Sequence, residues 1–339
     1  MSAAFQAVTD FPALPEERQR CVHNSNKIWF FGQKFHDMPS FNYGQFGAYG
    51  GAHSTFFDTV SGTFDPAGPR PFPAISNEEN VAEMIFAFQS RIYLLLYVHF
   101  GAFRVASLHS FNEDSGVWEA FADIQTSSND EIPHGEGNYK QNLILVDGDS
   151  EDGVYFVSFV DHQIRVHLLK ISTGERTAKW EIVGNLPDEL NMLRIQPTMA
   201  VIQDQNIFIQ GGVHGCGFRY QPLALFQFNI SDKSANFKEI ASEDDKPSFA
   251  FSGAQAHAIF PDQGTWVHIA GKNASGMTGS VFNGQIWFIR DLTTENPKWE
   301  KQTLEVPDPK GSDLYVSVQR QKRNIFIFSQ SLGVLNATV

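Results

Sequence analysis

One phrase recurs six times along the chain and constrains its fold more than any other feature. It is a small or polar turn followed by a run of alternating aliphatic and aromatic residues. The six copies begin at Lys27, Arg91, Gly153, Asn206, Thr265 and Asn324. The intervals between them are 64, 62, 53, 59 and 59 residues. Apolar runs bounded by turn residues are typical of β-strands, and a regular recurrence of them predicts an array of β-units.

Each unit is expected to hold four antiparallel strands. A shorter apolar segment precedes each copy, and an aromatic residue opens a further strand after most copies, as at Trp118, Trp180 and Trp299. Four-stranded units at this period are typical of propeller blades. The sequence therefore predicts an all-β fold, a six-bladed β-propeller in one domain, 1–339. The blades are expected at about 18–71, 80–124, 138–188, 194–244, 248–308 and 312–339, with 3–12 completing the last.

The two ends of the chain are expected to close the ring. The sixth copy stops without its outermost strand, and the segment Phe5–Pro12 matches Trp180–Pro187 in its order of aromatic, polar and apolar residues. The N-terminal segment is therefore predicted to be the fourth strand of the last blade. Closure of this kind protects the sheet edges that an open array would expose.

These residues resemble a Kelch-repeat propeller, whose strands end in a double glycine and whose outer strand opens with Trp. Gly211 and Gly212 supply the double glycine in the fourth copy, and Gly271 supplies half of it in the fifth. A WD-type propeller lacks support because no Trp-Asp dipeptide ends a strand. A different all-β array, such as a pair of sandwiches, is the remaining alternative.

Charge and composition narrow the choice of partners. The formal net charge is −13, so neither a nucleic acid nor an anionic membrane is an expected partner. Two cysteines, with no secretory signal and no apolar span, predict a cytoplasmic protein in a reducing compartment. The histidines show no metal-ligand spacing, so no metal or cofactor is expected. A monomer, or a subunit of a larger complex, is expected.

Candidate binding residues gather in the segments that join the second and third strands of the blades. They are aromatic residues and arginines, the types enriched at binding hot spots: Phe46, Tyr49, Phe103, Arg104, Arg165, Phe218, Arg219 and Tyr220. Three guanidinium groups on one rim would suit the carboxylates of an acidic peptide. Alternatively, the aromatic rings pack beneath their own loops and the arginines pair with acidic residues of the blade surfaces.

Two functions remain open. The first is a protein- or peptide-binding interaction module that uses the loops on one face of the propeller. The second is an enzyme that acts on a small polar or sugar-like substrate in the central funnel. No catalytic motif is visible in the sequence, which favours binding over catalysis, although one fold can host many activities.

Overall fold

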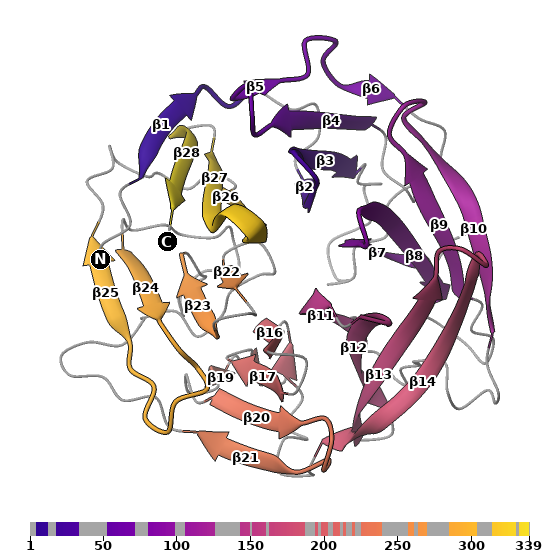
Figure 1. Ribbon diagram of the computed structural model, residues 1–339, viewed down its shortest axis with the longest axis vertical. Helices are drawn as coiled ribbons and strands as arrows, with labels where there is room; N and C mark the ends of the chain where they lie inside the picture. Colours follow the sequence, from indigo (N-terminus) through magenta and orange to yellow (C-terminus); the bar gives the residue numbers. More distant parts are fainter. Residues whose placement is uncertain are drawn as a thin grey trace.

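The computed structural model forms a ring of short β-sheets around a common axis (Figure 1). It describes residues 5–12, 18–33, 53–71, 81–98, 106–125, 143–149, 151–160, 163–186, 194–195, 198–202, 206–210, 213–214, 219–220, 225–238, 257–260, 264–269, 285–303, 314–329 and 332–338. Within these ranges the only helical segment is a single 3-10 turn, η5 (Arg320–Lys322). None of the described segments is a helix long and apolar enough to span a bilayer.

The first strand of each blade lies nearest the axis in Figure 1. These inner strands are β2 (Arg18–Asn24), β7 (Val81–Phe88), β11 (Leu143–Asp149), β16 (Thr198–Ile202), β22 (His257–Phe260) and β26 (Leu314–Gln319). Each pairs antiparallel with the second strand of its blade: β3 (Lys27–Gln33), β8 (Arg91–Val98), β12 (Gly153–Val160), β17 (Asn206–Gln210), β23 (Thr265–His268) and β27 (Asn324–Ser329). The second strands begin at the six residues where the sequence repeat begins.

The third and fourth strands extend each blade outward. The third strands are β4 (His53–Asp58), β9 (Ala106–Asn112), β13 (Gln163–Ser172), β20 (Leu225–Asn229), β24 (Gln285–Ile289) and β28 (Gly333–Thr338). The outer strands are β5 (Thr63–Phe64), β10 (Val117–Gln125), β14 (Thr177–Leu186), β21 (Ala235–Lys238), β25 (Glu300–Thr303) and β1 (Gln6–Thr9). In the first blade β6 (Arg70–Pro71) also pairs with β4.

The N-terminal strand completes the last blade, as the sequence predicts. β1 pairs antiparallel with β28, with Gln6 opposite Asn336 and Ala7 opposite Leu335. A bulge lies between Ala7 and Thr9. Phe5 and Phe11 flank the strand rather than belong to it, and Phe11 is buried. The two chain ends therefore meet within one four-stranded sheet.

Backbone hydrogen bonds join the described strands into five sheets, of which four are made of blade strands and one is a small separate sheet of β15 (Arg194–Ile195), β18 (Val213–His214) and β19 (Arg219–Tyr220). The second, third and fourth blades are fused into one 12-stranded sheet. Parallel bridges join Ile124 to Ala178 and Asp147 to Ala200, linking β10 to β14 and β11 to β16. The antiparallel pairs still form six four-stranded units. Neighbouring blades lie close enough at these two points for their backbones to bond.

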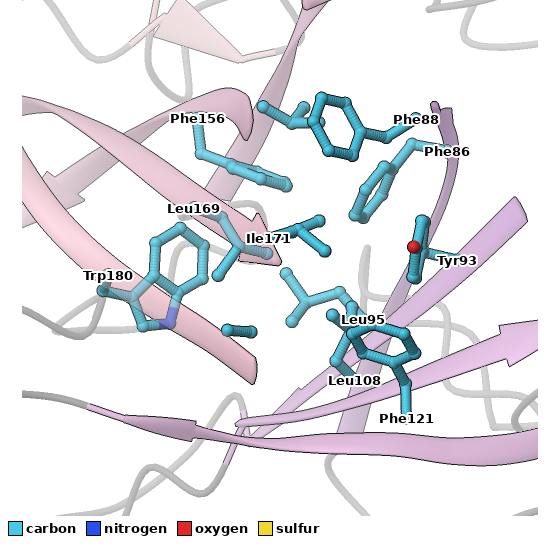
Figure 2. Close-up of a cluster of buried hydrophobic side chains, with 12 residues drawn as sticks. Phe86, Phe88, Tyr93, Leu95, Leu108, Phe121, Phe156, Leu169, Ile171 and Trp180 are labelled. Carbon is cyan, nitrogen blue, oxygen red and sulfur yellow. The ribbon is translucent and has the colours of Figure 1, made fainter. Parts of the chain in front are cut away.

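Hydrophobic side chains fill the six interfaces between neighbouring units, with one cluster at each. Alternation along each strand sends successive side chains to opposite faces. Phe30 therefore packs toward the last blade, while Trp29 and Phe31 pack toward the second. Figure 2 shows the interface of the second and third blades, where Tyr93 and Trp180 lie on opposite sides of one cluster. Each large apolar side chain buried in this way stabilises the ring by about 1.5–3 kcal/mol.

Candidate functional site at the loop end of the ring

The two ends of the ring carry different kinds of connection between strands. Strands within a blade alternate in direction, so the turns from first to second strand and from third to fourth strand lie at one end, the turn end. The connections from second to third strand, and from one blade to the next, lie at the opposite end, the loop end. Connecting segments held on a rigid scaffold are where binding and catalytic residues concentrate.

Side chains link neighbouring blades at the turn end. Asn24 donates to the carbonyl oxygen of Ser90 at 3.3 Å and to the carboxylate of Glu113 at 2.5 Å, which joins the first and second blades. Gln319 donates to the hydroxyl of Thr59 at 3.4 Å across the seam between the last blade and the first. These bonds connect neighbouring blades at the turn end.

A small second layer lies at the loop end of the fourth blade. It is a three-stranded antiparallel sheet of β15 (Arg194–Ile195), β18 (Val213–His214) and β19 (Arg219–Tyr220). β15 precedes the inner strand β16, and the β18–β19 hairpin lies between the second and third strands of the same blade. In register, Arg194 is opposite His214, and His214 is opposite Arg219. Two segments of chain thus bring three basic residues into one row.

The inner strands carry a few ionisable residues among apolar ones. Those near the loop end are Arg18, Arg20, Glu83 and His257, and those nearer the turn end are His23, Asp147 and Asp149. Glu83 is in register with Leu96 on the second strand, and His257 is in register with His268. His268 is buried, with its ring centroid 6.4 Å from that of Trp299. A carboxylate and an imidazole on inner strands are the residue types most used for proton transfer.

A buried serine–histidine pair lies between the second and third strands of the third blade. The Ser158 hydroxyl and His167 Nε2 are 2.7 Å apart, and the two residues are 0% and 1% exposed. The His167 ring also lies 6.1 Å from that of Trp180, in the interface between the second and third blades. A substrate has no access to a pair so enclosed, so its role is to satisfy polar groups inside the core.

Burial shifts the ionisation of two groups on the innermost strand of the first blade. Burial raises the pKa of the Cys21 thiol to about 12, and the thiol donates to the Val316 carbonyl oxygen at 3.4 Å. Burial, and then the nearby charge of Arg320, lower the pKa of His23 to about 4. Both groups are therefore uncharged at neutral pH. Within the described residues no three His, Cys, Asp or Glu side chains cluster to hold a metal ion.

The structure locates three of the eight predicted binding residues. Arg165 lies in β13 opposite Ser158 and Asn185 and is half-buried. Arg219 and Tyr220 form β19, so they belong to the small sheet at the loop end. The other five, Phe46, Tyr49, Phe103, Arg104 and Phe218, lie outside the described residues. The proposed gathering of Arg104, Arg165 and Arg219 therefore stays a prediction.

Sequence reasoning did not single out Arg194, His214 or Glu83. Arg194 and His214 lie in strands of two residues, which are too short to show periodicity. Glu83 carries a detectable signal, because it is a lone acidic residue in an otherwise apolar eight-residue strand. Attention to charged residues inside inner strands, rather than to loops alone, would have found it.

No family model matches the chain, and no curated protein matches it in sequence. The Kelch-repeat resemblance therefore stays a prediction. Solved structures do match. The α-L-arabinofuranosidase Arb93A of Fusarium graminearum with an iminosugar inhibitor has a TM-score of 0.51 at 12% identity, covering 100% of this chain and 97% of that one. The Fusarium graminearum GH93 α-L-arabinofuranosidase with arabinobiose has a TM-score of 0.52 at 12% identity, covering 98% and 97%. A periplasmic gluconolactonase of Pseudomonas aeruginosa has a TM-score of 0.42 at 11% identity, covering 82% and 71%.

These comparisons contradict the leading functional expectation. Two solved structures that match this chain over nearly its whole length are those of an enzyme, an α-L-arabinofuranosidase, and not of a protein- or peptide-binding module. The fold itself is established: the chain is a β-propeller of antiparallel four-stranded blades. The prediction of an interaction module was wrong. The absence of a recognisable sequence motif says little about catalysis in a propeller, because the residues of a site in the ring come from many strands.

Proposed function

We propose that this protein is an enzyme that acts on a sugar-like substrate at the loop end of the ring. The observation that carries the proposal is the likeness over the full chain to an α-L-arabinofuranosidase, solved with an iminosugar inhibitor and with arabinobiose. The loop end is the proposed location because catalytic residues concentrate on connecting segments held by a rigid scaffold, whereas Asn24 and Gln319 at the turn end bond to neighbouring blades.

Glu83 is the proposed proton-transfer residue. Of the acidic residues on the described inner strands, Glu83 is the nearest to the loop end, at the third position of β7. His257, the first residue of β22 on the far side of the ring, is the second residue proposed for acid–base catalysis. Groups of these two types, correctly placed, typically contribute about 10²–10⁴-fold to a rate by acid–base catalysis.

Glycoside hydrolysis is the reaction class that we would test first. One carboxylic acid protonates the oxygen of the leaving group, and a second carboxylate either attacks the sugar carbon or activates the water that does so. The bond between sugar carbon and leaving oxygen breaks, and the elements of water are added across it.

The test is turnover of a panel of nitrophenyl glycosides and short oligosaccharides, α-L-arabinofuranosides included. The wild-type protein is expected to hydrolyse at least one class, and Glu83→Gln is expected to lower kcat by about 10²-fold or more while KM changes little.

Glu175→Gln is the matched control. Glu175 is an exposed carboxylate in the turn that joins the third and fourth strands of the third blade, at the turn end. This variant should keep the wild-type rate and melting temperature. Absence of turnover on every substrate, together with no sugar binding on a glycan array, would refute the proposal.

A further inference from the structure

A second serine–histidine pair lies on the third strand of the second blade, and unlike the Ser158–His167 pair it is not enclosed. The Ser107 hydroxyl and His109 Nε2 are 3.2 Å apart. Both of these residues are half-buried, whereas Ser158 and His167 are fully buried. A hydroxyl and an imidazole therefore lie within hydrogen-bonding distance at a place that is partly open to solvent.

The strand β9 places this pair near the loop end of the ring, on the face turned toward the first blade. Ser107 is the second residue of β9, which begins at that end. Successive side chains of a strand point to opposite faces, so Ser107 and His109 share a face with Phe111. Phe111 packs in the cluster between the first and second blades, while Leu108, on the other face, packs toward the third. On the face of Phe111, apolar packing thus gives way to polar groups toward the loop end.

The pair has the two parts of an activated nucleophile. A serine hydroxyl is a weak nucleophile unless a general base, within about 2.6–3.2 Å, takes its proton. Burial lowers the pKa of His109, so its imidazole is neutral at neutral pH and able to accept that proton. When the ring carries its own hydrogen on Nδ1, Nε2 is the acceptor for the Ser107 hydroxyl. Pairing of β9 with β8, where Leu96 is opposite Ser107 and Leu94 is opposite His109, fixes the spacing of the two residues along the strand.

We propose that Ser107 is a nucleophile, with His109 as its general base, in a second catalytic site that hydrolyses short-chain esters. The proposal goes beyond the glycoside chemistry, because it uses neither Glu83 nor His257. A short acyl chain is expected because the pair is half-buried between two blades.

The reaction has two steps. In the first, Ser107 Oγ bonds to the carbonyl carbon of the ester, its proton passes to His109 Nε2, and the alcohol leaves with that proton. In the second, His109 takes a proton from water as the water oxygen bonds to the acyl carbon. The acid then leaves, and the proton returns to Ser107 Oγ. The net change is an ester and water converted to an alcohol and an acid.

The first test is labelling of the wild-type protein with a fluorophosphonate, followed by mass spectrometry of its peptides. An activated serine forms a bond from Oγ to phosphorus and releases fluoride. We expect the label on Ser107. Because the site is mapped on the wild-type protein, the result does not depend on whether a variant folds. A protein that takes no label, or takes it only on serines other than Ser107, would overturn the proposal.

The second test is turnover of nitrophenyl acetate and nitrophenyl butyrate by three variants. Ser107→Ala should abolish turnover of both esters. His109→Gln keeps a hydrogen-bonding side chain but removes the general base, so it should slow turnover by about 10²-fold or more. Ser110→Ala is the matched control, because Ser110 is a half-buried serine of the same strand on the opposite face, and it should keep the wild-type rate. Equal rates in Ser107→Ala and Ser110→Ala, or no turnover by the wild-type protein, would overturn the proposal.

Discussion

Gly333 lies so close to Thr9 that a β-carbon on Gly333 would be 2.6 Å from the carbonyl oxygen of Thr9. Gly333 begins β28 and Thr9 ends β1, the two strands that close the ring. The backbone of Gly333 also has a φ of +69°, which L residues rarely adopt. The seam between the two chain ends therefore needs a residue without a side chain.

Gly333→Ala is expected to destabilise the protein by more than about 2 kcal/mol, since backbone strain and steric overlap act together. Gly68→Ala is a matched control. Gly68 has the same φ of +69°, but nothing lies within 4 Å of the place that a β-carbon on Gly68 would occupy. The free energy of unfolding of Gly68→Ala should fall by only about 1–2 kcal/mol, which is the cost of the left-handed backbone. Urea unfolding of both variants gives the difference, and equal losses would show that the seam tolerates a side chain.

The outer aromatic residues give a second prediction. Trp180 is 1% exposed in the interface between the second and third blades, with its ring 5.2 Å from that of Phe156. Trp180→Ala is expected to cost about 3–5 kcal/mol. Trp180→Phe should cost much less, because Phe retains most of the apolar contact. Equal losses from the two substitutions would contradict a packing role.

Trp118 provides the comparison. It is half-buried at the edge of its cluster, with its ring centroid 5.0 Å from that of Phe111 and 5.2 Å from that of Phe31. Trp118→Ala is therefore expected to cost less than Trp180→Ala. Thermal unfolding of the two variants shows which substitution costs more stability. The reverse order would mean that burial does not decide how much an outer aromatic residue stabilises the protein.

The sequence predicted the strands well because their signal is local. The second strands begin at Lys27, Asn206 and Asn324 and their counterparts, where a turn meets an alternating apolar run. The closing strand was predicted from a match between Phe5–Pro12 and the outer strand of another blade. What the pattern could not predict is how tightly neighbouring blades approach, and so which of them share backbone bonds, as Asp147 and Ala200 do.

The site was predicted less well, for a physical reason. Function depends on residues from several blades that meet in space, and a one-dimensional pattern does not report such meetings. Arg219 was identified because an apolar residue, Phe218, precedes it in a glycine-rich segment. Its register partner His214, and Arg194 opposite His214, were not identified, because β15 and β18 have two residues each.

Cys21 should be inert in the folded protein. Cys21 is half-buried, and desolvation raises the pKa of its thiol to about 12, so almost none is thiolate at neutral pH. In a Cys216→Ser variant, a thiol reagent should label Cys21 only as fast as the protein unfolds. Labelling should become rapid in denaturant. Rapid labelling in buffer alone would contradict this burial.

His23 is expected to make stability depend on pH. Burial and the charge of Arg320 lower its pKa to about 4, against an ordinary value near 6.5. The unfolded chain therefore binds a proton more readily than the folded protein between these values. This contribution to stability is fully present above pH 6.5 and is lost as pH falls toward 4. From the size of the shift it amounts to about 3 kcal/mol.

The measurement is the free energy of unfolding of wild type and His23→Gln at pH 7 and at pH 4. His109, whose pKa is also lowered by burial, acts in the same direction and is common to both proteins. The loss between the two pH values should be smaller in His23→Gln by up to about 3 kcal/mol, whatever its absolute stability. Arg320→Gln should reduce the loss partly, because it removes the second cause of the shift. An identical loss in wild type and His23→Gln would show that His23 does not titrate between the folded and unfolded states in this range.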